Sequence, residues 1–174
     1  MFFESVAKII SKYGAMFLQG AEITQLIAII GTLVGFVIGL GIGIVRTIPV
    51  DAKSSPVKRF LLKIVNGLLA IYIEIFRGTP MIVQAMVIFY GFAALTGVSL
   101  NRILAGIVIV SINTGAYMAE IVRGGILSID KGQFEASHSI GMTHGQTMTS
   151  IVLPQAVRNI LPATGNEFMI NIKD

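Results

Sequence analysis

Residues Glu135 to Pro154 read EASHSIGMTHGQTMTSIVLP, and this is the longest polar-leaning interval in a very apolar chain. The interval begins with an acid and two small residues, carries Gly141 in its middle, and ends with Ile151, Leu153 and Pro154. Polar groups have no water to bond with inside a bilayer, so a polar segment between membrane-spanning helices must lie outside it. We therefore expect this interval to lie outside the membrane, where an ordered segment can meet a soluble partner.

The composition predicts an all-α, polytopic helical membrane protein. Of 174 residues, 54% are hydrophobic and 13% are charged, which is about half the charged fraction of average soluble domains. A membrane-spanning helix needs roughly 20 residues, so the chain has room for about four spans. The absence of cysteine excludes disulfides and thiolate metal sites. His138 and His144 have no neighbouring ligands that would complete a metal site.

Apolar segments and their charged boundaries divide a single transmembrane domain, residues 1–174. The first residues mix apolar positions at helical spacing with charges, as in an amphipathic helix at the membrane surface. The segment from Gln25 to Val45 carries no charge, as expected of a span. The expected order is an interfacial helix at 1–19, spans at 20–46, 60–92 and 102–122, a loop at 123–158, and the start of a fourth span at 159–174.

Positive charges predict how the chain is oriented in the membrane. Short loops rich in lysine and arginine face the cytoplasm, so we expect the N-terminus outside and the loop at 123–158 in the cytoplasm. The net charge of +4 is explained by such loops, which also meet membrane lipid, and no nucleic-acid surface is inferred. The first loop carries the bases Arg46, Lys53, Lys58, Arg59 and Lys63 and the acid Asp51.

Four glycines in the first span predict a close contact between helices. Gly31, Gly35, Gly39 and Gly43 recur every four residues and therefore share one helical face. Small residues at this spacing let two helix backbones approach closely in a membrane. Glycine is common in membrane helices generally, but four in register favour a packing seam, either within the bundle or against a partner subunit.

The second span contains a proline and two charges. Residues 60–92 are too many for one straight span, and Pro80 is expected to bend a single long helix that crosses to the outside. Glu74 and Arg77 are three residues apart and could pair on one face. Two positions stay open for this pair, the interior of the bundle or the cytoplasmic headgroups.

The third span contains further polar candidates. Asn113 and Thr114 either line a pathway or form hydrogen bonds to other helices. Glu120 and Arg123 are expected to pair at the cytoplasmic end of the span, which argues against Glu120 as a ligand for a substrate.

The interval quoted first resembles the EAA loop of the membrane subunits of bacterial ABC importers. That loop has the pattern Glu-Ala-Ala, three residues, glycine, nine residues, and Ile-x-Leu-Pro. This chain departs from the pattern only where a small serine stands for the second alanine. The corresponding residues are Glu135, Ala136, Ser137, Gly141, Ile151, Leu153 and Pro154.

Among these importers, the chain is similar to the polar amino-acid permeases, which serve histidine, glutamine, arginine and cystine. Residues 74–80 read EIFRGTP and residues 116–126 read AYMAEIVRGGI, as in that family. The resemblance covers about Tyr13 to Asp174 and implies the type I permease fold of ABC importers.

The resemblance also implies partners and a mechanism. Such a permease forms the translocation path of an ATP-driven amino-acid importer in the bacterial inner membrane. It pairs with a second permease subunit, identical or different, and two ATPase subunits hold the ATP and Mg. The EAA loop forms short coupling helices in a groove of each ATPase, and an extracytoplasmic binding protein delivers the amino acid. The chain itself has no phosphate-binding loop motif, so we expect it to be no enzyme and to hold no cofactor.

Three alternatives stay open, together with the identity of the amino acid. In the resembled family the chain continues through a fourth and a fifth span, so we expect this sequence to be truncated. It could then act as a scaffold subunit that binds an ATPase without transport. An ion-coupled secondary transporter would need intramembrane acids or paired repeats, and no repeat is found. A membrane enzyme would need a motif such as HExxH or GxSxG, which is absent.

Overall fold

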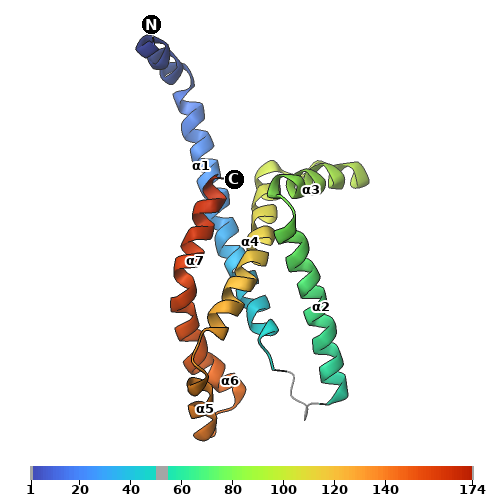
Figure 1. The fold of residues 1–174 in the computed structure, drawn as a ribbon. Helices are drawn as coiled ribbons and strands as arrows, with labels where there is room; N and C mark the ends of the chain where they lie inside the picture. The colour runs from blue at the N-terminus through green and yellow to red at the C-terminus, as the bar shows by residue number, and fades with distance from the viewer. Residues whose placement is uncertain (1, 50–54, 174) are drawn as a thin grey trace.

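The computed structural model describes residues 2–49 and 55–173, and every regular element in these ranges is helical (Figure 1). This confirms the predicted all-α class. Asp51 and Lys53 of the basic loop lie outside the described residues. The elements are α1 (Phe2–Arg46), α2 (Pro56–Gly78), α3 (Met81–Thr96), α4 (Arg102–Leu127), α5 (Lys131–Ser139), α6 (His144–Thr147), the π-helical turn η1 (Met148–Val152) and α7 (Leu153–Lys173).

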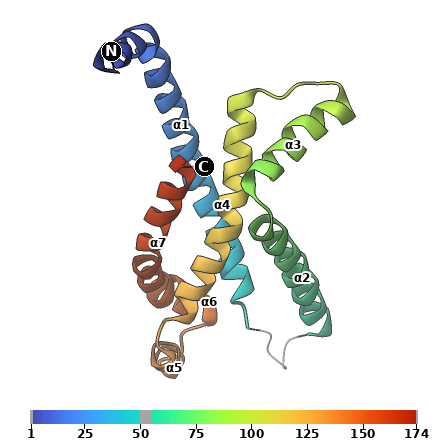
Figure 2. The same cartoon turned by 45° about the horizontal axis from the view of Figure 1, so that its top comes forward.

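Two helices, α1 and α4, are each long and apolar enough to cross a membrane, and the pair formed by α2 and α3 passes the same test together. The expectation of one bent helix at 60–92 is wrong, because α2 and α3 are separate helices that meet at 107° (Figure 2). Pro80 lacks a backbone N–H and so cannot continue the hydrogen bonds of α2. In the described part of the chain, α7 does not pass the test for a span.

Several boundaries differ from the expected ones. One helix, α1, runs through both the segment expected at the membrane surface and the first span, although Figure 2 shows its first turns bending away from the rest. The third span, α4, continues to Leu127, so the loop is shorter than residues 123–158. Helix α7 begins at Leu153 and not at residue 159. The interfacial position of residues 1–19 stays a prediction.

Helices α1 and α4 pack against each other along the glycine face of α1. A Cβ added at Gly35 would lie 2.7 Å from Thr114 Cβ and 3.1 Å from Gly115 N, so the seam has no room for a side chain. The seam therefore lies within this chain. Both partners advance by four residues together, so the two helices run parallel. The facing pairs are Gly31 with Val110, Gly35 with Thr114, Gly39 with Met118, and Gly43 with Val122.

Candidate functional site

Two short helices, α5 and α6, project from the end of the bundle where α4 ends and α7 begins (Figure 1). The carboxylate of Asp130 caps α5 by accepting a hydrogen bond from the N–H of Gly132. Thr143 caps α6 in a capping box with Gln146. These caps satisfy N–H groups that have no partner inside the helix. Each helix is therefore defined by its own first turn, and the pair is an ordered protrusion.

Gly141 forms the turn between α5 and α6. Its φ of +83° lies in the left-handed region, which glycine adopts without the penalty that a Cβ brings. Its N–H bonds to the carbonyl of His138 at 3.0 Å, and the N–H of Met142 bonds to the carbonyl of Ser137 at 3.1 Å. This is the Schellman pattern that ends a helix. A Cβ at Gly141 would meet nothing within 4 Å, so the requirement for glycine comes from backbone conformation alone.

Pro154 lies at the second position of α7, and α7 follows the π-helical turn η1 directly. A proline inside a helix leaves the carbonyl four residues earlier without a donor and clashes with it. Here the preceding turn widens, and the N–H of Leu153 bonds to the carbonyl of Met148, five residues back. Helical backbone runs from α6 through η1 into α7 without a loop.

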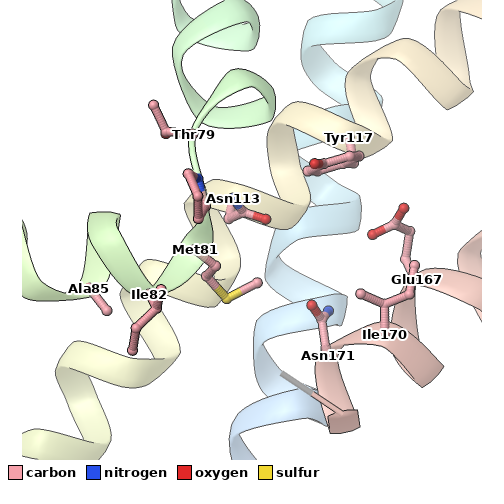
Figure 3. Close-up of a pocket in the computed structure, with 10 residues that line it drawn as sticks. Thr79, Met81, Ile82, Ala85, Asn113, Tyr117, Glu167, Ile170 and Asn171 are labelled. Atoms are coloured by element: carbon pink, nitrogen blue, oxygen red, sulfur yellow. The ribbon is translucent and has the colours of Figure 1, made fainter.

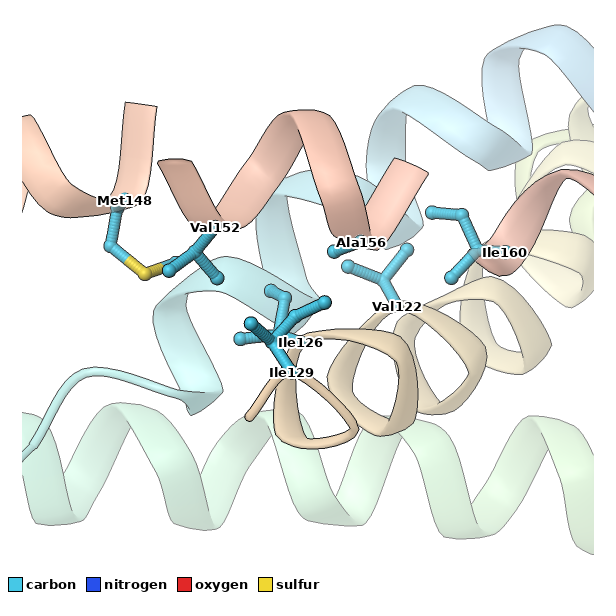
Figure 4. Close-up of a cluster of buried hydrophobic side chains, with 7 residues drawn as sticks. All are labelled: Val122, Ile126, Ile129, Met148, Val152, Ala156 and Ile160. Carbon is cyan, nitrogen blue, oxygen red and sulfur yellow. The ribbon is translucent and has the colours of Figure 1, made fainter. Parts of the chain in front are cut away.

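A cluster of buried apolar side chains fixes the root of this protrusion to the bundle (Figure 4). One side of the cluster comes from the end of α4 and from Ile129 just beyond it, and the other comes from η1 and α7. Val152 has no exposed surface, and Ile126 retains 2%. The segments that lead into and out of the protrusion are therefore packed tightly against each other, since buried side chains do not yield independently. The members are Val122, Ile126, Ile129, Met148, Val152, Ala156 and Ile160.

The structure separates the EAA-type residues into two groups. Glu135 and Ala136 are exposed on α5, whereas Ser137 is buried, with 1% exposure. Leu153 packs against the apolar cluster, and Ile151 is only half-buried. Sequence reasoning missed the buried Val152 and Met148. Their spacing of four residues is the signal in the sequence that could have indicated a shared buried face. This spacing between apolar residues is common in this chain, so it does not single them out.

A cavity of about 510 Å³ lies where α4 and α7 face the corner between α2 and α3 (Figure 3). The polar side chains on its wall include Asn113 and Tyr117 of α4 and Glu167 and Asn171 of α7. A concave, mixed polar and apolar site of this size suits a small ligand. The remaining lining residues are Thr79, Pro80, Met81, Ile82, Ala85 and Ile170.

Side-chain amides fill the gap that Pro80 leaves at the corner. In a continuous helix the N–H of residue 80 would bond to the carbonyl of Phe76, and proline has no N–H to offer. Asn113 Nδ2 and Gln84 Nε2 donate to that carbonyl instead, each at 3.0 Å. Gln84 Nε2 also donates to the carbonyl of Thr79 at 2.9 Å. Sequence reasoning missed Gln84 as a site residue, although its side-chain amide stands out in the apolar α3.

Glu74 and Arg77 do not pair with each other in the described part of the chain. Both side chains are exposed. The Arg77 guanidinium lies 5.3 Å from the centre of the Tyr117 ring and so joins α2 to α4. The pairing of Glu74 with Arg77 that their spacing allows does not form in this structure, where the cation lies over the aromatic ring of Tyr117.

Thr114 belongs to a buried polar node that joins three helices. Asn171 Nδ2 donates to Thr114 Oγ1 at 3.0 Å and to Thr32 Oγ1 at 2.9 Å, which connects α7 to α4 and α1. Thr114 is fully buried, and Asn171 retains 7% exposure. Hydrogen bonds of this kind hold membrane helices together. Thr114 thus makes an interhelical bond, while Asn113 both bonds between helices and lines the cavity.

An ionic cluster joins the ends of α1 and α4. Glu120 forms ion pairs with Arg46 of α1 and with Arg123 one turn further along α4, the latter at 2.9 Å. The pairing of Glu120 with Arg123 confirms the expectation from their spacing. The link to Arg46 was not foreseen, because it depends on which helix packs beside α4. Glu120 is 20% exposed, so water only partly screens these charges.

Replacing the central carboxylate should loosen the contact between α1 and α4. Glu120→Gln keeps the size of the side chain but leaves two half-buried guanidinium groups without a counter-charge. We expect the free energy of unfolding in detergent to fall by about 1–3 kcal/mol. Glu74→Gln is the control, since Glu74 is exposed. Equal melting temperatures for the two variants would show that the cluster contributes nothing to stability.

The comparison with known proteins identifies the family. Residues 54–174 match the family described as binding-protein-dependent transport system inner membrane component. The chain belongs to this family. The permease is 38% identical over 160 residues to the glutamine transport system permease protein GlnP of Escherichia coli (strain K12), a match that covers 91% of this chain and 68% of that protein. It is 34% identical over 157 residues to the arginine transport system permease protein ArtQ of Bacillus subtilis, which covers 90% and 66% of the two chains.

Solved structures agree with this assignment. The permease superposes with a TM-score of 0.78 on a chain of an amino acid ABC transporter crystallised with histidines, at 36% identity, over 94% of this chain and 71% of that one. The methionine ABC transporter MetNI gives a TM-score of 0.71 at 23% identity and shows the shared fold alone. The protein is thus a membrane permease subunit with the fold of ABC importers, and it spans about two thirds of the length of its relatives.

Proposed function

We propose that this permease forms part of the path of an ATP-driven amino-acid importer. Its similarity to permeases named for glutamine, arginine and cystine supports an amino acid as the solute. In this assembly a second permease subunit completes the path, and an extracytoplasmic binding protein delivers the solute. A pair of ATPase subunits holds the ATP and Mg.

One observation carries the coupling role, namely the protrusion made of α5 and α6. Its two helices are capped independently, joined by the left-handed turn at Gly141, and rooted in the apolar cluster on α4 and α7. An element that is ordered yet projects beyond the bundle suits docking into a groove of another subunit. The exposed Glu135 and Ala136 lie on it.

The directions of the helices support the proposed orientation. Because α1 and α4 run parallel, Arg46 and Arg123 lie at the same end of the bundle, and both bind Glu120 there. Helix α2, whose first turn holds Lys58 and Arg59, begins at this end (Figure 1), and basic loops face the cytoplasm. In our proposal the protrusion is therefore cytoplasmic, the N-terminus lies outside, and the protein resides in the inner membrane of a bacterium.

Docking can be tested by reversing the exposed charge on α5. Glu135→Lys should weaken copurification of the ATPase by roughly ten-fold, because a new charge at a docking surface costs about 1–2 kcal/mol. The melting temperature of the permease should stay unchanged, since Glu135 is exposed. The ATPase retained on tagged permease is measured by quantitative blotting.

Glu22→Lys is the matched control, because it makes the same change of charge at an exposed position of α1, away from α5. It should retain the ATPase at the wild-type level. Undiminished copurification with Glu135→Lys would contradict docking through α5. Reduced copurification of the ATPase with both variants would point to an effect of net charge alone.

A further inference from the structure

Asn113 belongs both to the corner between α2 and α3 and to the cavity. Its Nδ2 faces the corner, where it donates to the Phe76 carbonyl at 3.0 Å and to Gln84 Oε1 at 2.9 Å. Within residues 2–49 and 55–173, no group donates a hydrogen bond to its Oδ1. Figure 3 shows this oxygen on the side of Tyr117 and Glu167, across the cavity.

The backbone carbonyls of the corner determine which end of each amide is nitrogen. A carbonyl can only accept, so the atom of Gln84 that lies 3.0 Å from the Phe76 oxygen and 2.9 Å from the Thr79 oxygen must be its nitrogen. Gln84 therefore presents its oxygen to Asn113. An amide oxygen accepts only, so Asn113 must turn its nitrogen toward the corner. Its own oxygen is left for the cavity.

We propose that Gln84 is a positioning residue for solute recognition and that it acts through Asn113. By supplying the donor that Pro80 lacks, Gln84 holds the corner and turns Asn113 Oδ1 into the cavity as a hydrogen-bond acceptor. Across the cavity stands the carboxylate of Glu167. An open acceptor on the cavity wall fits a solute group that donates hydrogen bonds, such as an ammonium group. This inference rests on the proposed function, because it concerns the solute that the permease moves.

The first test measures binding of radiolabelled arginine and glutamine to the purified complex of permease and ATPase. Both Gln84→Leu and Asn113→Ala should weaken the Kd by roughly ten-fold, with the number of sites unchanged. Because Gln84 acts through Asn113, the double variant should also show about a ten-fold weakening and not about a hundred-fold one. Gln25→Leu, the same change at an exposed position of α1, should bind as the wild type does.

The outcomes separate this inference from the proposed function. If the wild-type complex binds neither amino acid, the proposed function fails at this cavity and the inference fails with it. If the wild type binds but Gln84→Leu matches Gln25→Leu, only the inference is overturned. Independent, multiplying effects of Gln84→Leu and Asn113→Ala would likewise overturn it, as would a loss of sites at constant Kd.

The second test measures the distance between α2 and α3, which depends on the geometry of the corner. Leu68 of α2 and Leu95 of α3 are 62% and 90% exposed, and the chain has no cysteine, so a spin label attached to a cysteine at each position reports the distance between the two helices. Gln84→Leu should broaden and shift the distance distribution. Asn113→Ala should change it little, because Gln84 still donates to both carbonyls. An unchanged distribution in Gln84→Leu would contradict the proposed role.

Discussion

Gly39→Val is expected to separate α1 from α4 and to lower the free energy of unfolding by about 3 kcal/mol or more. A Cβ at Gly39 would overlap Met118 Cβ and would lie 2.8 Å from Ala119 N, so backbone as well as a side chain blocks it. Backbone atoms cannot turn aside as a flexible side chain can. The helices must therefore move apart, which also loosens the neighbouring contacts at Gly35 and Gly43.

The measurement is thermal unfolding of the purified chain in detergent, with Gly41→Val as the control. Gly41 is an exposed glycine of the same helix, and a Cβ there would meet nothing within 4 Å. Gly41→Val has the same cost of placing valine in a helix as Gly39→Val, but its side chain does not overlap α4. Equal melting temperatures for the two variants would show that the seam tolerates a side chain.

Gly141→Val is expected to abolish coupling while the spans stay folded. A β-branched residue at a φ of +83° is strained by roughly 1–2 kcal/mol, and moving φ to negative values redirects α6 relative to α5. We expect ATP-dependent uptake by the assembled transporter to fall by at least about ten-fold. The melting temperature of the permease should fall by no more than about 8 °C, because Gly141 lies outside the apolar cluster.

Two variants serve as controls for Gly141→Val. Gly141→Asn should retain more uptake, since asparagine tolerates the left-handed region better than other residues with a side chain. Gly145→Ala should behave as the wild type, because this glycine lies in α6 and a Cβ there would meet nothing within 4 Å. Equal uptake by Gly141→Val and the wild type would show that the turn does not matter for coupling.

Local patterns in the sequence predicted much of the fold. The charge-free segment before Arg46 predicted a span, and the four glycines predicted a close helix contact. The resemblance at Glu135 to Pro154 predicted the permease family, which the comparisons confirm. The part that the exposed Glu135 and Ala136 take in coupling stays a prediction.

Other features could not be read from local patterns. Glu74 and Arg77 have the spacing of an ion pair, yet Tyr117 from another helix is the partner of Arg77. Pro80 predicted a bend, but whether a helix bends or breaks depends on donors that come from elsewhere. Here Asn113 of α4 and Gln84 of α3 supply those donors, so the Phe76 and Thr79 carbonyls at the sharp corner are both hydrogen-bonded.

The sequence by itself therefore determined the helical class, the spans of α1 and α4, and the glycine spacing. It also determined the family, because each of these features depends on the order of residues within one segment. Only the tertiary structure decided that the glycines face α4, that Asn171 joins three helices, and that Asn113 turns an oxygen into the cavity. The physical reason is that such contacts depend on how the surfaces of distant helices fit together, and no local period records that fit.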